Sequence, residues 1–304
     1  MKKFLAFTMA AAMTLSLAAC GGGSSSGSNT SADGSGSAAF KLGGTGPLTG
    51  DASIYGLAAQ RGAQIAVDEI NAEGGAIQFE LKYEDDVNDP EKAVNAYNAL
   101  KEWGMQISLG SVTTQPGIAT SSYNFADSIF ALTPSASSPD VISGKDNVYQ
   151  MCFSDPNQGT ASAKYISEQK LGEKVFIIWK SDDNYSTGIK DKFVAEAETL
   201  GLNVVGNATF TADSKNDFTV QLTQAKQAGA DLLFLPIYYD AASLILTQAN
   251  AMGYAPKFFG VDGMDGILTQ ANFDTSLAEG VMLLTPFNAD DEDEATQHFV
   301  KAYQ

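Results

Sequence analysis

Short apolar runs alternate with longer segments of helical period from Phe40 to the end of the chain. This alternation is typical of strand–helix–strand units, which build a mostly parallel sheet covered by helices. Three later runs are apolar at every position, at residues 175–179, 232–235 and 281–284. Because an uninterrupted apolar run indicates a strand covered on both faces, these runs predict strands with helices on both sides.

Local signals predict several individual elements. Small and apolar side chains recur at helical spacing in a series that ends at Ile70, which predicts an amphipathic helix over residues 55–71. A strand is expected at residues 79–84, followed by a helix with Asp89 as its N-cap and Pro90 at its first position. Further helices are predicted at residues 158–169, 185–200, 216–228 and 240–252.

The number of strands indicates how the chain is divided. We count at least nine predicted strands, which is more than one sheet of this class usually carries. The predicted fold class is therefore α/β, with two doubly wound parallel-sheet lobes joined by a hinge. In such folds, ligands bind beyond the carboxyl ends of the strands.

The first twenty residues predict export. Lys2 and Lys3 precede an apolar run at residues 4–17, and the sequence LAAC ends at Cys20. Residues 1–19 are thus a predicted signal peptide. The LAAC motif resembles the lipobox of bacterial lipoproteins, which implies cleavage before Cys20 and a lipid on its sulfur. An ordinary signal peptide with a chance cysteine is the alternative. Residues 20–39 are rich in Gly and Ser and predict a flexible, lipid-anchored linker.

Charge and composition exclude some classes of partner. The chain carries 36 acidic and 18 basic residues, so nucleic acid is an improbable partner. Arg61 is the only arginine, so no arginine cluster exists to bind phosphate. Beyond Cys20, the only cysteine is Cys152, which lies in an apolar stretch and is expected to be a buried, inert thiol.

Signals for enzymatic chemistry are weak. The only histidine, His298, lies next to an acidic run, which disfavours a catalytic triad and a zinc site. A glycine-rich segment at residues 44–50 follows the first predicted strand, as in dinucleotide-binding folds, but its spacing is GxGxxxG and Pro47 removes a backbone donor. We therefore expect no enzyme, no metal and no cofactor, and a tethered NAD-dependent oxidoreductase is the less favoured reading.

Two neighbouring loops are rich in hydrogen-bond donors. Residues 111–117 and 133–139 each follow a predicted strand and contain mostly Ser, Thr and Pro. Pro116 suits the first position of a helix capped by Thr114. Without arginine, such loops suit a single carboxylate held by hydroxyl and backbone N–H groups. Ordinary turns of this composition are the alternative.

An ordered series of motifs resembles periplasmic binding proteins for branched-chain amino acids in ABC transporters, over residues 40–304. These motifs are GPLTG at 46–50, YG at 55–56, GA at 62–63, DEINA at 68–72, GG at 74–75, DD at 85–86, DP at 89–90, TPSA at 133–136, DP at 155–156, QG at 158–159, FG at 259–260 and DG at 262–263.

The resemblance implies a clamp of two lobes that closes on a free amino acid. Five residues of the first lobe would hold its α-carboxylate: Ser111, Thr113, Thr114, Ser135 and Ser137. Tyr55 would form a wall of the pocket from the same lobe. From the second lobe, the resemblance implies aromatic contacts from Tyr185 and Tyr238, and an ion pair between Asp262 and the α-ammonium. Partly buried core tyrosines and a turn at Asp262 are the alternatives, and Tyr239 could replace Tyr238 if the register shifts by one.

The resemblance also implies the domain boundaries. The first lobe is expected at residues 40–153 with 285–304, and the second lobe at residues 154–284, with hinges near 152–155 and 285–287. Many relatives carry arginine where this chain has Gln150, so an ion pair between the lobes is not expected there. Relatives continue beyond Gln304, so the chain is expected to lack the carboxy-terminal part of the first lobe.

The predicted function is that of an extracytoplasmic, lipid-anchored substrate-binding protein of an ABC importer. It is expected to capture a branched-chain or other apolar amino acid between its two lobes and to deliver it to the permease. Its expected partners are this ligand, the membrane through its anchor, and an ABC permease with its ATPase subunits, with the protein itself a monomer. In the alternative reading, the same fold binds an amide, a urea or an aromatic acid, as a transporter subunit or a sensor.

Overall fold

The computed structural model of the protein describes residues 39–304. The predicted signal peptide, Cys20 and nearly all of the predicted linker lie outside these residues. Within residues 39–304 the strands form two separate sheets of five strands each, and every strand pair is parallel. The prediction of an α/β fold with two parallel-sheet lobes is therefore confirmed, with ten strands where at least nine were expected.

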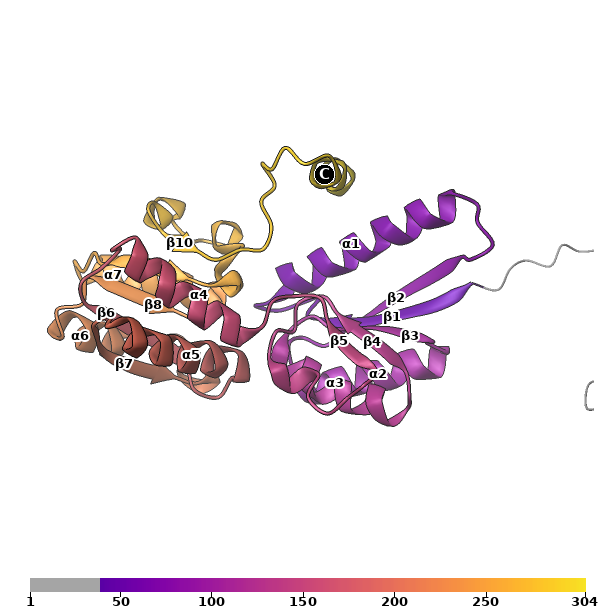
Figure 1. Cartoon of the computed structure of the whole chain (residues 1–304), viewed down its shortest axis with the longest axis horizontal. Coiled ribbons are helices and arrows are strands. Elements are labelled where there is room, and N and C mark those ends of the chain that lie inside the picture. The colour runs from indigo at the N-terminus through magenta and orange to yellow at the C-terminus, as the bar shows by residue number, and fades with distance from the viewer. Residues whose placement is uncertain (1–38) are drawn as a thin grey trace, which may run out of the picture. The chain divides into compact units, whose positions relative to one another are not determined.

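The first sheet has the strand order β2-β1-β3-β4-β5. Figure 1 shows it in the half of the ribbon that runs from indigo to magenta. Its strands are β1 (Phe40–Gly46), β2 (Phe79–Asp85), β3 (Ile107–Ser111), β4 (Phe130–Thr133) and β5 (Val148–Gln150). Three helices connect them, namely α1 (Ser53–Ala72), α2 (Pro90–Trp103) and α3 (Thr114–Ala126).

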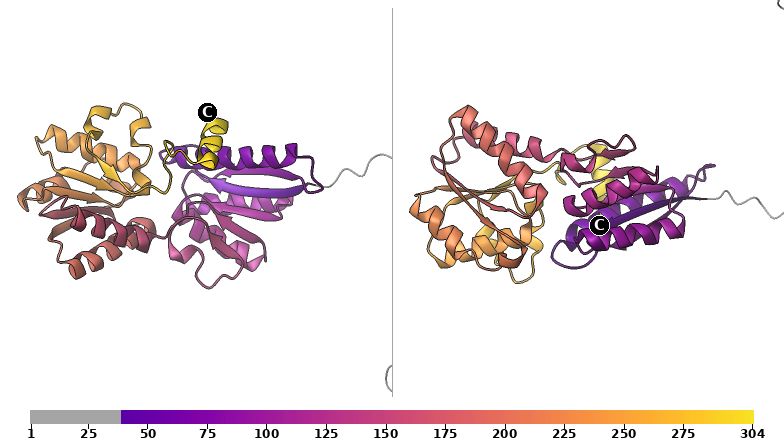
Figure 2. Two further views of the ribbon diagram at one scale, coloured as in Figure 1. Left: turned by 45° about the horizontal axis from the view of Figure 1, so that its top comes forward. Right: turned by 90° about the horizontal axis from the view of Figure 1, so that it is seen from below.

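The second sheet has the order β10-β9-β8-β6-β7. Its strands are β6 (Val175–Lys180), β7 (Val204–Phe210), β8 (Leu232–Leu235), β9 (Lys257–Gly260) and β10 (Met282–Leu283). Its helices are α4 (Asp155–Glu168), α5 (Asn184–Leu200), α6 (Thr219–Gln227) and α7 (Tyr239–Ala251). Figure 2 shows helices on both sides of this sheet. The last helix, α8 (Glu294–Tyr303), packs against α1.

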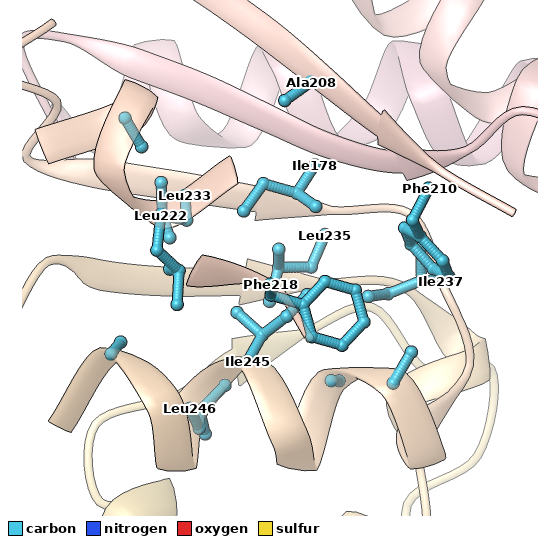
Figure 3. Close-up of a cluster of buried hydrophobic side chains, with 14 of the residues drawn as sticks. Ile178, Ala208, Phe210, Phe218, Leu222, Leu233, Leu235, Ile237, Ile245 and Leu246 are labelled. Atoms are coloured by element: carbon cyan, nitrogen blue, oxygen red, sulfur yellow. The ribbon is translucent and has the colours of Figure 1, made fainter. Parts of the chain in front are cut away.

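Alternate residues of β6 and β8 explain why these strands are apolar throughout. Ile177 and Phe234 pack in one cluster with residues of α4 and α5, such as Phe193. Ile178 and Leu235 point to the other face, where they pack with residues of α6 and α7 (Figure 3). Because side chains alternate along a strand, a strand between two helical layers needs apolar side chains at both parities.

The third predicted strand of this kind is only partly observed. β10 spans two residues at the edge of its sheet, and both are only partly buried. The apolar run at residues 281–284 still packs on both faces, because Val281 and Leu283 contact one core cluster and Met282 and Leu284 contact the other, but all four side chains are only partly buried. An edge strand has one neighbour, β9, so fewer atoms cover it.

Helix starts agree with the capping signals at one position and differ at another. The Asp89 side chain accepts a hydrogen bond from Lys92 N at 2.8 Å and caps α2, which begins at Pro90 as predicted. For α3, however, the N-cap is Thr113 rather than Thr114. Thr114 is therefore the first helical residue, and its hydroxyl accepts a hydrogen bond from Ser137 N at 3.3 Å instead of capping the helix.

The apolar stripe of α1 is only partly covered in the described part of the chain. Val67 is buried on this helix, but Ile70 is 42% exposed. Helix α8 covers part of α1. Its Phe299 lies beside Gly62, and the Arg61 guanidinium lies over the ring of its Tyr303. The helix predicted at residues 55–71 is confirmed, and it spans Ser53–Ala72.

A carboxylate fixes the turn that leads into α1. Asp85 accepts hydrogen bonds from Leu48 N at 2.8 Å and from the Thr49 hydroxyl at 2.5 Å. Burial alone would raise the pKa of Asp85, but these bonds and one from Val87 N hold it below its ordinary value. The β1–α1 turn, which precedes Tyr55, is therefore tied to the end of β2.

No helix within residues 39–304 is both long and apolar enough to cross a membrane.

The packing of α4 on α5 gives a test of this architecture. A methyl group on Gly159 would lie 2.7 Å from Phe193 N, so Gly159→Ala should push the helices apart. We expect the free energy of unfolding to fall by about 2 kcal/mol, measured by chemical denaturation. Gly75→Ala is the control, because a methyl group there meets no atom within 4 Å. Equal values for the two variants would contradict close packing of α4 on α5.

Candidate functional site

A small cavity lies at the carboxyl ends of strands from both sheets. Its volume is about 70 Å³. Its lining is Tyr55, Val112, Thr113, Ser135, Ser137, Tyr185, Tyr238, Asp262 and Gly263. Seven of the nine residues predicted to bind ligand are therefore brought together. Tyr55 and Tyr185 lie in the first turns of α1 and α5, and the other five lie in segments that directly follow strands. Parallel strands end at one edge of a sheet, so the loops that follow them converge there.

The first lobe contributes hydroxyl groups. Thr113 occupies the N-cap position of α3, but its side chain makes no capping hydrogen bond, and its buried hydroxyl oxygen has no partner among the described residues. Ser135 donates a hydrogen bond to the carbonyl oxygen of Val112 at 2.5 Å, which ties the loop after β4 to the loop after β3. Ser137 lies on the same loop as Ser135 and also lines the cavity. This side of the cavity is polar and carries no charged side chain.

Two predicted residues, Ser111 and Thr114, lie behind this wall rather than in the lining. The hydroxyl of Ser111 is hydrogen-bonded to Thr45 at 2.6 Å and to Thr120 at 2.8 Å. Thr114 is 1% exposed and binds the backbone of Ser137. These bonds hold the two donor-rich loops in register. The placement favours a supporting role for Ser111 and Thr114, and it does not favour direct ligand contact.

The second lobe contributes an aromatic wall. The rings of Tyr185 and Tyr238 are stacked at 4.7 Å, with 5° between their planes. Tyr55, from the first lobe, packs against Tyr238 at 5.7 Å and against Tyr239 at 5.3 Å. The Tyr55 hydroxyl also donates a hydrogen bond to the carbonyl oxygen of Gly263. Tyr55 therefore bridges the cavity between the two lobes.

Asp262 is the acidic group of the cavity. Its Oδ1 accepts a hydrogen bond from the Tyr185 hydroxyl at 2.5 Å, and its backbone N–H donates to Gln158 Oε1 at 3.2 Å. The Tyr185 hydroxyl in turn accepts from Gly263 N at 2.9 Å. Burial raises the pKa of Asp262, while the hydrogen bond from Tyr185 acts in the opposite direction. Among the ion pairs of residues 39–304, none involves Asp262.

A larger cavity of about 310 Å³ adjoins the small one and shares Tyr238 with it. Its lining includes Val87, Phe210 and Ile237 together with polar groups. Lys215, in the second lobe, pairs here with Asp51 of the β1–α1 turn and lies 3.6 Å from Asp240. This ion pair is a further contact between the lobes.

Sequence reasoning missed several residues of the site. Gln158 was part of a quoted motif but received no role, and Lys215 had no signal at all. Asp155 was considered only as part of a hinge, yet it is fully buried and neither carboxylate oxygen has a hydrogen-bond partner among the described residues. Burial raises the pKa of Asp155 to about 8. The sequence signal that could have identified it is the DP motif at residues 155–156, which places an acid at the first position of a helix.

Two residues set aside in the sequence have unremarkable surroundings. Cys152 is only partly buried, rather than buried as expected. Burial still raises the pKa of its thiol to about 12, which disfavours a reactive thiolate. His298 is exposed and hydrogen-bonded to Glu69 at 2.9 Å. In the part of the chain that the structure describes, no group of three or more His, Cys, Asp or Glu side chains is arranged to hold a metal ion.

Comparison with known proteins identifies the family. A family model described as "Periplasmic binding protein" matches residues 39–304. The chain belongs to the periplasmic binding protein family. This family consists of substrate-binding proteins of transporters, and membership implies an extracytoplasmic location. The family resemblance seen in the sequence motifs is confirmed.

Several proteins that this chain resembles are named for the amino acids that they bind. The chain is 30% identical over 221 residues to the Leu/Ile/Val-binding protein BraC3 of Rhizobium johnstonii, covering 72% of this chain and 60% of that protein. It is 28% identical over 272 residues to the leucine-, isoleucine-, valine-, threonine- and alanine-binding protein of Pseudomonas aeruginosa, covering 87% and 71% of the two chains. The periplasmic binding protein described here thus spans about 60% of the length of the first of these relatives.

A solved structure supports the fold. The branched-chain amino acid transporter substrate binding protein LivJ of Streptococcus pneumoniae, in complex with isoleucine, superimposes with a TM-score of 0.77 at 27% identity. The match covers 88% of this chain and 76% of that one. The two-lobed architecture is therefore that of a solved family member.

The hydrogen bonds of Tyr185 give a test of the site's construction. Tyr185→Phe removes the donor to Asp262 and the acceptor for Gly263 N. Because buried polar groups without partners are costly, the free energy of unfolding should fall by about 1 to 3 kcal/mol in denaturation experiments. Tyr238→Phe keeps the same stacked pair and is the control. Its hydroxyl has no hydrogen bond to another group of residues 39–304, so we expect a change within about 0.5 kcal/mol. A similar loss in both variants would count against the network.

Proposed function

We propose that the protein is the substrate-binding component of an ABC importer and captures a branched-chain or other apolar amino acid between its lobes. One observation carries this proposal: a partly buried carboxyl group, Asp262, has no cationic partner among the described residues and faces hydroxyl-rich loops across a cavity. A zwitterion would supply a positive group for the acid and a negative group for the hydroxyls. Buried charges need such partners.

The carboxylate end of the ligand is proposed to lie against the first lobe. Thr113 offers a hydroxyl that has no partner among the described residues, and Ser137 lies beside it in the lining. Thr113 also lies at the N-cap position of α3, and the N-terminus of a helix attracts negative charge. Ser135 completes this set, whereas Ser111 and Thr114 hold the loops from behind. No arginine is needed for one carboxylate held in this way.

The ammonium end is proposed to pair with Asp262. The hydrogen bond from Tyr185 and the backbone contact with Gln158 fix the position of this carboxyl. An ammonium group beside it would offset the burial that raises its pKa, so the ligand would favour the charged form of Asp262. Tyr55, Tyr185 and Tyr238 would enclose the α-carbon between the two ends.

The side chain of the ligand requires more room than the small cavity offers. Ligand pockets usually measure about 300 Å³ or more. The adjoining cavity of about 310 Å³ begins at Tyr238 and has apolar groups in its lining, which suits an apolar side chain. Entry of a ligand would break the contact between Tyr55 and Gly263. We therefore propose that the lobes separate to admit the ligand and close over it.

The names of the relatives support the choice of ligand. The Rhizobium and Pseudomonas proteins are named for binding leucine, isoleucine and valine, and the LivJ structure holds isoleucine. We propose the same class for this chain. The lobes are proposed to comprise residues 40–153 with 285–304, and residues 154–284, with hinges near 152–155 and 285–287.

The proposal includes the membrane anchor and the partners. Cleavage after residue 19 and lipidation of Cys20 would tether a monomer to the outer face of the cell membrane through the linker at residues 20–39. A tether would keep the binding protein near its ABC permease, which is driven by ATPase subunits. The sequence LAAC at residues 17–20 supports this part of the proposal.

Ligand binding is tested by a calorimetric titration of the purified protein with leucine, isoleucine and valine. We expect binding, and we expect Asp262→Asn to raise Kd by about 30-fold or more, because the ammonium loses its charged partner. Asp265→Asn is the control. This neighbouring acid is exposed and lies outside the lining, so its removal should change Kd by less than about threefold.

The same titration includes an amide, a urea and an aromatic acid. Binding of one of these, with no response to any amino acid, would replace the proposed ligand class. Equal effects of the Asp262 and Asp265 substitutions would contradict the role of Asp262.

The anchor is tested by cell fractionation. The unaltered protein should sediment with membranes, and Cys20→Ser should move it into the soluble extracytoplasmic fraction, because no lipid can be attached. Cys152→Ser is the matched control and should remain with the membranes. An unchanged distribution of the Cys20 variant would contradict lipidation at this position.

A further inference from the structure

Asp155 is a buried acid for which the proposed ligand contacts give no role. It begins α4, the first helix of the second lobe, and is 0% exposed. Neither of its carboxylate oxygens has a hydrogen-bond partner among residues 39–304. Such an arrangement is costly for a carboxylate and much less so for a neutral carboxyl group.

The neighbour of Asp155 on the cavity side is Ser137. The backbone N–H of Asp155 donates to the carbonyl oxygen of Ser137 at 3.1 Å. The Ser137 hydroxyl is also close enough to lower the pKa of Asp155, although it does not complete a hydrogen bond to either oxygen. Because Ser137 lines the cavity, Asp155 lies behind a residue that is proposed to hold the ligand's carboxylate.

The other groups that act on Asp155 come from three elements. They are Asp262 in the turn after β9, Asp183 at the N-cap of α5 and Asp140 in the turn after β4. Asp155 in turn raises the pKa of Cys152, which lies in the segment before α4. The three carboxyl groups each raise the pKa of Asp155 when charged. Helix α5 packs against Asp155 through Gly188, and a methyl group added at Gly188 would lie 3.6 Å from Asp155 Oδ2. A cation also acts on this group of acids, because the charge of Lys180 lowers the pKa of Asp183.

Burial is the main reason why the pKa of Asp155 reaches about 8, and the surrounding acids act in the same direction. The helix N-terminus favours the charged form, but its effect is small beside that of burial. At neutral pH, most molecules therefore hold a proton on Asp155.

We propose that protonated Asp155 donates a hydrogen bond to Ser137 Oγ and thereby turns the Ser137 hydroxyl hydrogen toward the ligand's carboxylate. An ionised Asp155 would instead accept that hydrogen, and the ligand would face an oxygen lone pair. No covalent bond is made or broken, and the proton stays on Asp155 while the ligand is bound. Asp155 is thus a positioning residue that acts through Ser137. This inference rests on the proposed function.

The consequence is a pH-dependent affinity. Only the protein with a protonated Asp155 binds the ligand in the proposed way, so the apparent Kd rises as the pH increases and that form is lost. With a pKa of about 8, Kd should be about twofold higher at pH 8 and about tenfold higher at pH 9 than at pH 6. Asp155→Asn offers an amide donor at every pH, so its affinity should lack this change.

The test is a calorimetric titration with isoleucine at pH 6, 7, 8 and 9, on the unaltered protein and on Asp155→Asn. The ligand's own ammonium group titrates equally in both titrations, so the ratio of the two Kd values isolates Asp155. We expect this ratio to rise about tenfold from pH 6 to pH 9. In the Ser137→Ala background, Asp155→Asn should leave the pH profile unchanged. A constant ratio at all four pH values would overturn the inference.

A second measurement needs no ligand. The folded protein holds a proton on Asp155 that the unfolded chain loses near pH 4. The free energy of unfolding should therefore fall as pH rises from about 4 to about 8, and Asp155→Asn should lack this part of the fall. If the free energies of unfolding of the unaltered protein and of Asp155→Asn depend on pH in the same way, Asp155 does not hold the proton and the inference is wrong. If no amino acid binds at any pH while the stability profiles differ as expected, the proposed function fails and the proton on Asp155 stands, but its role in ligand binding falls.

Discussion

The site depends on a partly buried acid, Asp262, whose hydrogen-bond partners are all neutral groups. Asp262 accepts a hydrogen bond from Tyr185 and lies beside Gln158, and no lysine or arginine pairs with it in the described part of the chain. Burial raises its pKa, so the site favours the arrival of a positive charge. The opposite wall presents hydroxyl groups without a charged side chain. This asymmetry between the lobes explains why a small zwitterion is the ligand class we propose.

The two-sheet architecture produces this asymmetry. Every lining residue follows a parallel strand, so the polar loops of one sheet and the aromatic and acidic loops of the other converge on one cavity. The strands beneath are stabilised by apolar side chains on both faces, as Ile177 and Ile178 show. The loops can therefore carry polar groups without weakening the cores. Contacts between the lobes combine the aromatic packing of Tyr55 on Tyr238 and Tyr239 with polar pairs such as Lys215 with Asp51.

Sequence signals were sufficient where structure is local. Asp89 and Pro90 predict the start of α2 because capping depends on neighbouring residues. The resemblance located Tyr185, Tyr238 and Asp262, which the fold brings to one cavity, although their ligand roles stay predictions. Burial was harder to predict, because it depends on distant segments. Asp155 is buried by the packing of α4 on α5, and the short edge strand β10 depends on its single neighbour. The shift of the α3 cap from Thr114 to Thr113 is a local error of one residue.

The account depends most on the orientation of a bound amino acid. A crystal structure of the protein with isoleucine tests this directly. We expect the ammonium nitrogen within hydrogen-bond distance of an Asp262 carboxylate oxygen, and the carboxylate on the hydroxyls of Thr113 and Ser137. A ligand bound in the reverse orientation, or bound elsewhere with Asp262 facing no ligand atom, would contradict the account.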